Sequence, residues 1–123
     1  MTFGDGDTDR RYANLRRPNV ISIKSPEEIE KMRRAGRVVA LVHAELRESV
    51  KPGVSTWELD RIARERCEKE GAVPAFLGYR GYPAALCVSI DNEVVHGIPS
   101  KDRVLEEGSI VSFDFGAKVD GYY

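Results

Sequence analysis

The fold of this chain is decided by residues 77–123, LGYRGYPAALCVSIDNEVVHGIPSKDRVLEEGSIVSFDFGAKVDGYY, which are rich in glycine and aromatic side chains. Short apolar runs separated by turn-forming residues are typical of strands. The sequence predicts three strands, over residues 85–90, 94–96 and 109–115. Asp91-Asn92 marks a tight turn between the first two, and Asp120-Gly121 is a strong hairpin-turn signal. A further strand is therefore expected to begin at the end of this stretch.

Two amphipathic helices are predicted before this stretch, so we expect an α+β fold with two helices packed on an antiparallel sheet. Ser25 is an N-cap with Pro26 at the first helical position, and Glu28 closes a capping box. Ser55 and Glu58 form a second box. The apolar side chains that recur at helical spacing and are expected to be buried are Ile29, Met32, Ala35, Val39, Val42 and Leu46, then Leu59, Ile62, Ala63 and Cys67.

The remaining helical residues are interpreted structurally. Charged side chains opposite the second stripe, including Asp60 and Arg64 four residues apart, are predicted to form a solvated face. Trp57 in the first turn of the second helix is interpreted as a packing anchor, and His43 as an ordinary boundary histidine. Nothing in the helices points to catalysis.

The composition, 41% apolar and 32% charged, is that of one ordinary domain. The 20 acidic residues nearly cancel the 19 basic ones, so no overall attraction to DNA or to an anionic membrane is expected. No apolar run approaches the roughly 20 residues of a bilayer span, and no signal-peptide core is visible, which predicts a cytoplasmic location. Cys67 and Cys87 are predicted to be reduced thiols.

Residues 1–19 are predicted to be a flexible polar tail, because their few apolar side chains cannot offset the entropy of ordering them. Their arginines could contact RNA, although a solvated tail balanced by nearby aspartates is the favoured interpretation. Residues 20–123 are expected to form the folded domain.

Asp114 is the most informative single residue, because aspartate is disfavoured in strands and here lies between Phe113 and Phe115. Alternation places it on the face of Ile110 and Ser112, opposite the phenylalanines. A carboxylate held on a strand suits a divalent metal ligand. The alternative is a strand-end aspartate satisfied by the following turn.

Two further groups of side chains are candidates for chemistry. His96, just before Gly97, could act as an acid or base, as a hydrogen-bond donor or as a metal ligand, or it could simply bond to nearby backbone. Three aromatic side chains and a thiol could line an apolar pocket for a thioether side chain, or the loop could pack its own rings. These four residues are Phe76, Tyr79, Tyr82 and Cys87.

In combination, four segments resemble the N-terminal half of type I methionine aminopeptidases: SIKSPEEIEKMRRAGRVV, VKPGVSTWELD, LGYRGYPAALCVSIDNEVVHGIPS and GSIVSFDFGAKVDGYY. The resemblance covers residues 21–123. It implies the pita-bread fold, in which helices lie outside a curved antiparallel sheet. It also implies a centre of two divalent ions (Co, Mn, Fe or Zn) that activates water to release the initiator methionine of nascent proteins.

Position by position, the resemblance makes Asp114 the first metal-ligating aspartate and His96 the catalytic histidine that contacts the scissile amide. It places Phe76, Tyr79, Tyr82 and Cys87, together with His96, around the substrate's methionine. Phe76 replaces a frequent cysteine and Arg80 a frequent histidine.

The resemblance also implies that the second ligating aspartate lies roughly two positions beyond Tyr123 and that the other ligands belong to a second half. This chain alone is therefore expected to bind no metal tightly and to be inactive, whereas the complete enzyme is expected to be a monomer, with ribosome contact as an option. Three alternatives stay open: a non-catalytic pita-bread module that binds a ribosome or protein partner, a proline-specific relative, and a half-domain completed by a separate chain.

Overall fold

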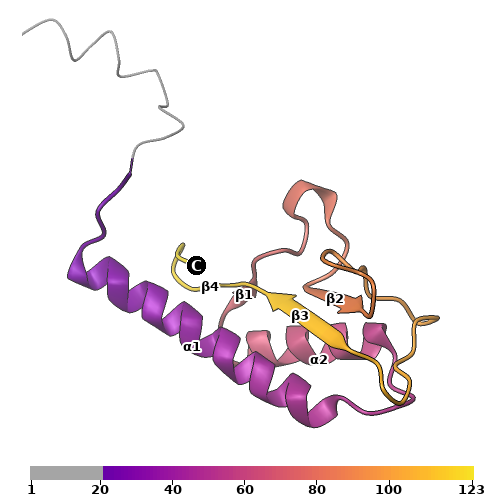
Figure 1. Cartoon of the computed structure of the whole chain (residues 1–123). Helices are drawn as coiled ribbons and strands as arrows, with labels where there is room; N and C mark the ends of the chain where they lie inside the picture. Colours follow the sequence, from indigo (N-terminus) through magenta and orange to yellow (C-terminus); the bar gives the residue numbers. More distant parts are fainter. Residues whose placement is uncertain (1–20) are drawn as a thin grey trace, which may run out of the picture.

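The computed structural model describes residues 21–123, and the predicted tail over residues 1–19 lies outside this range (Figure 1). The elements in chain order are α1 (Pro26–Ser49), α2 (Thr56–Lys69), β1 (Val73–Pro74), the 3-10 turn η1 (Tyr79–Gly81), β2 (Leu86–Ile90), β3 (Val111–Phe115) and β4 (Ala117–Lys118). The predicted α+β class is confirmed. No helix within residues 21–123 has both the length and the apolar character needed to cross a membrane.

Helix α1 begins as predicted. The Ser25 hydroxyl accepts from the backbone N–H of Glu28 at 3.2 Å, and the Glu28 carboxylate accepts from the N–H of Ser25 at 3.1 Å. Its buried side chains are Ala35, Val38, Val42 and Leu46. The prediction was wrong for Ile29 and Met32, which are 45% and 39% exposed. The hydrophobic core contacts α1 mainly along the second half of the helix. The helical spacing of apolar residues continues towards the N-terminus beyond the core, so it predicted burial for residues that no core covers.

Helix α2 differs from the sequence prediction at its start. The Ser55 hydroxyl accepts from the N–H of Glu58 at 3.1 Å, so Ser55 is the predicted N-cap. The second half of the capping box does not form, because the Glu58 carboxylate pairs with Arg61 instead. Trp57 is 41% exposed, with the Lys101 ammonium 4.7 Å from its ring centroid. It is therefore not a core anchor.

Two short antiparallel pairs make up the strands. β2 pairs with β3, with Leu86 opposite Phe115 and Cys87 opposite Asp114, and β1 pairs with β4. The strand predicted over residues 94–96 does not form. His96 has φ +61°, a left-handed conformation that interrupts extended backbone. The Asp120-Gly121 turn forms as predicted, with reciprocal backbone hydrogen bonds between Val119 and Tyr122.

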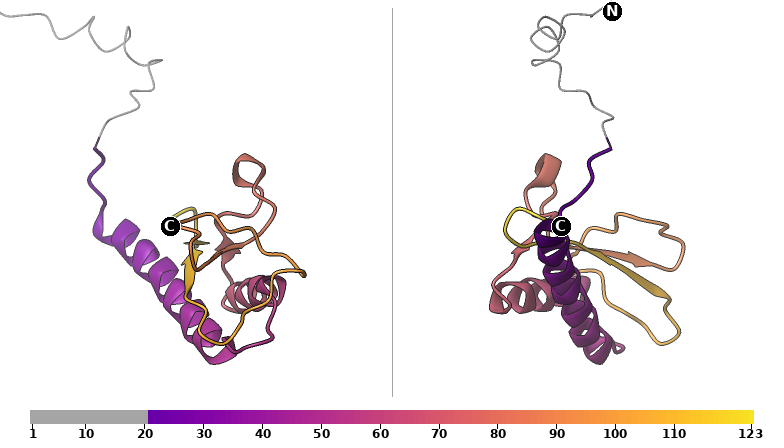
Figure 2. Two further views of the ribbon diagram at one scale, coloured as in Figure 1. Left: turned by 45° about the vertical axis from the view of Figure 1, so that its right-hand side comes forward. Right: turned by 90° about the vertical axis from the view of Figure 1, so that its left-hand side faces the viewer.

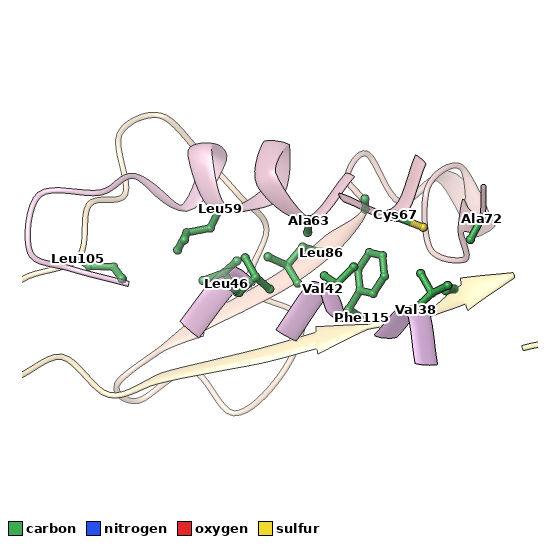
Figure 3. Close-up of a cluster of buried hydrophobic side chains, with 13 residues drawn as sticks. Val38, Val42, Leu46, Leu59, Ala63, Cys67, Ala72, Leu86, Leu105 and Phe115 are labelled. Atoms are coloured by element: carbon green, nitrogen blue, oxygen red, sulfur yellow. The ribbon is translucent and has the colours of Figure 1, made fainter. Parts of the chain in front are cut away.

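The core lies between the helices and the β2–β3 pair (Figure 3). Val42 and Leu46 from α1, Leu59 from α2 and Leu86 and Val88 from β2 are fully buried. Both helices therefore stand behind the strands that carry the candidate residues, while the segment containing η1 projects away from the helices (Figure 2). The other face of β3 carries the exposed side chains of Ser112 and Asp114.

Candidate functional site

A cavity of about 570 Å³ lies between the η1 segment and the β2–β3 pair. Its walls bring together all six residues that the sequence nominated, and the lining is completed by Arg80, Gly81, Pro83 and Ile98. The six are Phe76, Tyr79, Tyr82, Cys87, His96 and Asp114. These residues are spread over nearly forty positions of the chain, so their convergence is a product of the tertiary fold.

The Asp114 carboxylate is presented by strand alternation, as predicted. Phe115 beside it is 6% exposed and points into the core, whereas Asp114 is exposed on the opposite face. Its neighbour across the ladder is Cys87, which lines the same cavity. Its side chain is exposed at the cavity, and its role as a metal ligand stays a prediction from the sequence.

His96 is brought to the cavity by the residue that follows it. The carbonyl of Gly97 accepts from the Val88 N–H at 2.9 Å, and the Gly97 N–H donates to the buried Ser89 hydroxyl at 3.1 Å. A Cβ at Gly97 would lie 1.9 Å from the Val88 carbonyl oxygen, so only glycine fits against β2. The His96 side chain is exposed towards the cavity mouth.

The aromatic wall is held by glycine turns and one hydroxyl. Gly78 and Gly81 both have φ +79°, which lets the chain fold around η1. The Tyr82 hydroxyl donates to the Leu86 carbonyl at 2.9 Å, and its ring meets Phe76 edge to face at 6.4 Å. Burial, followed by its contact with Cys87, raises the pKa of Tyr82 above the ordinary tyrosine range. Tyr82 is therefore a neutral part of the wall.

The sequence interpretation missed Asp60. Instead of lying on a solvated face, it is 5% exposed, and one carboxylate oxygen accepts from the N–H groups of Ala85 and Leu86 at 2.8 and 2.9 Å. Its other oxygen accepts from Arg64 at 3.1 Å. Asp60 thus fixes the start of β2. The sequence did hold a signal of this burial: Asp60 precedes Ala63 by three residues and so lies on the same helical face as the apolar stripe.

A divalent metal ion finds one suitable oxygen ligand in the cavity, the Asp114 carboxylate. No group of three His, Cys, Asp or Glu side chains close enough to hold an ion exists within residues 21–123. The residues present therefore fit one position of a metal centre and do not by themselves build one.

The two thiols are expected to react at different rates, which tests the cavity directly. Cys67 is fully buried in the core and burial raises its pKa to about 11, whereas Cys87, although only 5% exposed, lies in the wall of the cavity. At about pH 8, iodoacetamide should modify Cys87 at least roughly tenfold faster than Cys67, because the thiolate is the reacting form. Peptide mass spectrometry measures both rates, and unfolded protein is the control in which they should be similar. Faster modification of Cys67 would contradict the burial described here.

The fold, two helices behind short antiparallel strand pairs, is the α+β arrangement of the pita-bread class, and its cavity combines a carboxylate, an imidazole and aromatic rings. Metallopeptidase family M24 matches residues 30–123, and the chain belongs to this family. It is 56% identical over 108 residues to a methionine aminopeptidase of Aquifex aeolicus, covering 83% of this chain and 42% of the relative. It is 52% identical over 104 residues to methionine aminopeptidase 1 of Bacillus subtilis, covering 85% and 42%.

Solved structures agree with this assignment. A methionine aminopeptidase of Thermotoga maritima superposes with a TM-score of 0.81 at 46% identity, over 82% of this chain and 41% of that one. An X-Pro aminopeptidase of the same organism superposes with 0.63 at 26% identity, over 79% and 26%. The predicted resemblance to methionine aminopeptidases is confirmed, and this chain spans about two fifths of the length of the relatives it matches.

Proposed function

We propose that this chain supplies one half of a methionine aminopeptidase active site, which removes the initiator methionine from nascent polypeptides. The observation that carries the proposal is the single cavity that joins the Asp114 carboxylate, the His96 imidazole and an aromatic wall. The similarity to methionine aminopeptidases supports the choice of substrate. The complete enzyme is proposed to act as a cytoplasmic monomer, and ribosome contact stays a prediction from the resemblance.

The proposed pocket for the methionine side chain is the wall of Phe76, Tyr79, Tyr82 and Cys87. Aromatic rings and a thiol present polarisable, largely apolar surface, which favours an unbranched thioether over a charged side chain. The Tyr82 hydroxyl donates its hydrogen bond to the Leu86 carbonyl, so the polar end of this ring is satisfied within the protein. The pocket therefore offers the substrate an apolar face.

The proposed reacting end of the cavity contains Asp114 and His96. Asp114 would hold a divalent ion through its carboxylate, and such ions polarise a peptide carbonyl and lower the pKa of bound water. His96 would hydrogen-bond to the scissile amide and keep it in place as negative charge develops on the peptide. Cys87 lies directly opposite Asp114 in the ladder, so the ion and the methionine side chain would be held by neighbouring residues.

The remaining ligands are proposed to come from residues outside this chain. One carboxylate does not hold a divalent ion tightly against water, and residues 21–123 contain no cluster of three candidate ligands. This supports the proposal that the chain alone binds Co, Mn, Fe or Zn weakly and is inactive. It does not select among these metals.

The test is to assay the chain alone and together with a polypeptide equivalent to the part of the Aquifex aeolicus enzyme that it does not match. Alone, the chain should show weak Mn²⁺ binding by calorimetry and release no methionine from a Met-Ala-Ser peptide. With its complement, methionine release should appear and should depend on added metal. Asp114→Asn and His96→Ala should each lower that release by at least roughly 100-fold, as expected for a metal ligand and a group that contacts the reacting amide.

His43→Ala is the matched control, because the chain has only these two histidines and His43 lies on α1, away from the cavity. Its effect on methionine release should be small. Tight binding of two ions with turnover by the chain alone would contradict the proposed division of the site. Assembly with the complement without any cleavage would favour a non-catalytic binding module.

A further inference from the structure

The segment of residues 93–98, which carries His96, lies beside β2 without belonging to a strand. Val94 and Val95 are 85% and 63% exposed, so side-chain packing does little to hold it. It is hydrogen-bonded to β2 at two residues: Gly97, through Val88 and Ser89, and Glu93, whose backbone N–H donates to the Ile90 carbonyl at 3.0 Å. A left-handed residue at His96 also costs conformational energy. Further contacts are needed to keep the imidazole at the cavity.

Arg103 supplies these contacts on both sides of His96. One guanidinium nitrogen donates to the carbonyl of Ile98 at 2.9 Å, two residues after the histidine. Another donates to the carboxylate of Glu93, three residues before it. The same Glu93 oxygen accepts from the N–H of Ile90 at 3.3 Å, at the end of β2. The forked guanidinium therefore bridges the two ends of the segment.

The backbone of Arg103 is hydrogen-bonded to helix α2. The carbonyl of Arg103 accepts from the N–H of Thr56, the first residue of α2, at 2.8 Å. The fully buried Thr56 hydroxyl also accepts from the N–H of Ser100 at 2.8 Å. The loop that carries Arg103 is thus pinned to the N-terminus of α2, and the guanidinium reaches from there to the segment of His96.

We propose that Arg103 and Glu93 form a clamp that positions His96. They are positioning residues, because neither lines the cavity. Their side chains are 28% and 37% exposed, so solvent weakens the charge attraction between them. The pair therefore acts mainly by fixing the position of the segment between Glu93 and Ile98. Arginine is needed, since lysine offers a point charge and cannot make the same planar, forked contact. The consequence for catalysis rests on the proposed function, whereas the clamp itself does not.

The clamp is tested by amide hydrogen exchange, followed by NMR on this chain without metal or peptide. In Arg103→Gln, exchange of the Val88 and Gly97 amides should accelerate roughly tenfold, because opening of the segment breaks both of their hydrogen bonds. The Leu86 amide, bonded to Asp60 in the core, should not change. Arg103→Lys should shift the same amides in the same direction.

Lys101→Gln is the matched control, because Lys101 is an exposed cation of the same loop whose ammonium lies over the Trp57 ring. Unchanged exchange in Arg103→Gln, or an equal acceleration in Lys101→Gln, would overturn the clamp. If Arg103→Gln proves unfolded, Glu93→Gln takes its place, with a smaller acceleration at Gly97 expected and no change overturning the idea.

The complemented enzyme separates this inference from the proposed function. There, Arg103→Gln should lower kcat for methionine release more than it raises KM, because the pocket for the side chain is untouched. Failure of the complemented wild-type chain to release methionine would count against the proposed function alone, and the exchange result would still decide the clamp.

Discussion

Gly97→Ala is expected to destabilise the fold by about 3 kcal/mol or more, the range of a severe steric clash with the backbone. The new Cβ would lie 1.9 Å from the carbonyl oxygen and 2.6 Å from the carbonyl carbon of Val88. Because Val88 is a fully buried residue of β2, that backbone cannot move aside without disturbing the core. Urea denaturation followed by circular dichroism measures the loss.

Gly36→Ala provides the matched control for this substitution. Gly36 is in the middle of α1 and a Cβ there meets nothing within 4 Å. Alanine should therefore stabilise the chain by about 0.5–1 kcal/mol through its higher helix propensity. A mild effect of Gly97→Ala, comparable in size to that of Gly36→Ala, would show that the segment of His96 does not lie against β2 as described.

Asp60→Ala should destabilise the chain by about 3 kcal/mol, although aspartate at a helix surface is usually replaceable. The substitution leaves the N–H groups of Ala85 and Leu86, both fully or nearly fully buried, without their acceptor. Arg64 loses its partner as well. The start of β2 would then loosen, and the thiol of Cys87 should become more reactive.

Two variants on α2 isolate the cause. Asp60→Asn keeps an oxygen that can accept from both amides and should cost clearly less than Asp60→Ala. Glu65→Gln removes an exposed carboxylate from the same helix and should change stability by less than about 0.5 kcal/mol. An equal loss in all three variants would point to a general charge effect and against the buried hydrogen bonds.

Much of the fold was predictable because its signals are local. Ser25 and Glu28 form the predicted capping box, and strand alternation correctly placed Asp114 opposite the buried Phe115. The errors occurred where packing overrides local preference. Residues 94–96 have the apolar character of a strand, yet the left-handed φ of His96 prevents one. Ile29 and Met32 fit the helical period but lie on α1 before the core begins.

The candidate site shows the same division. Residue chemistry alone nominated His96, Asp114 and the aromatic loop, and the family resemblance connected them. The distance along the chain between Phe76 and Asp114 gives no information about their proximity, which depends on the register of β2 against β3. Arg103 carried no sequence signal at all, because its role depends on which carbonyl and carboxylate the tertiary fold brings within its reach.

By itself, the sequence determined the two helices, their N-caps, two of the three predicted strands, the hairpin turn and the candidate residues that line the cavity. These features depend on interactions over a few positions, which the order of residues specifies directly. Only the tertiary structure decided that Asp60 is buried, that His96 is held by a glycine pressed against Val88, and that six separated side chains share one cavity. The physical reason is that burial and convergence depend on long-range packing, which no local pattern encodes.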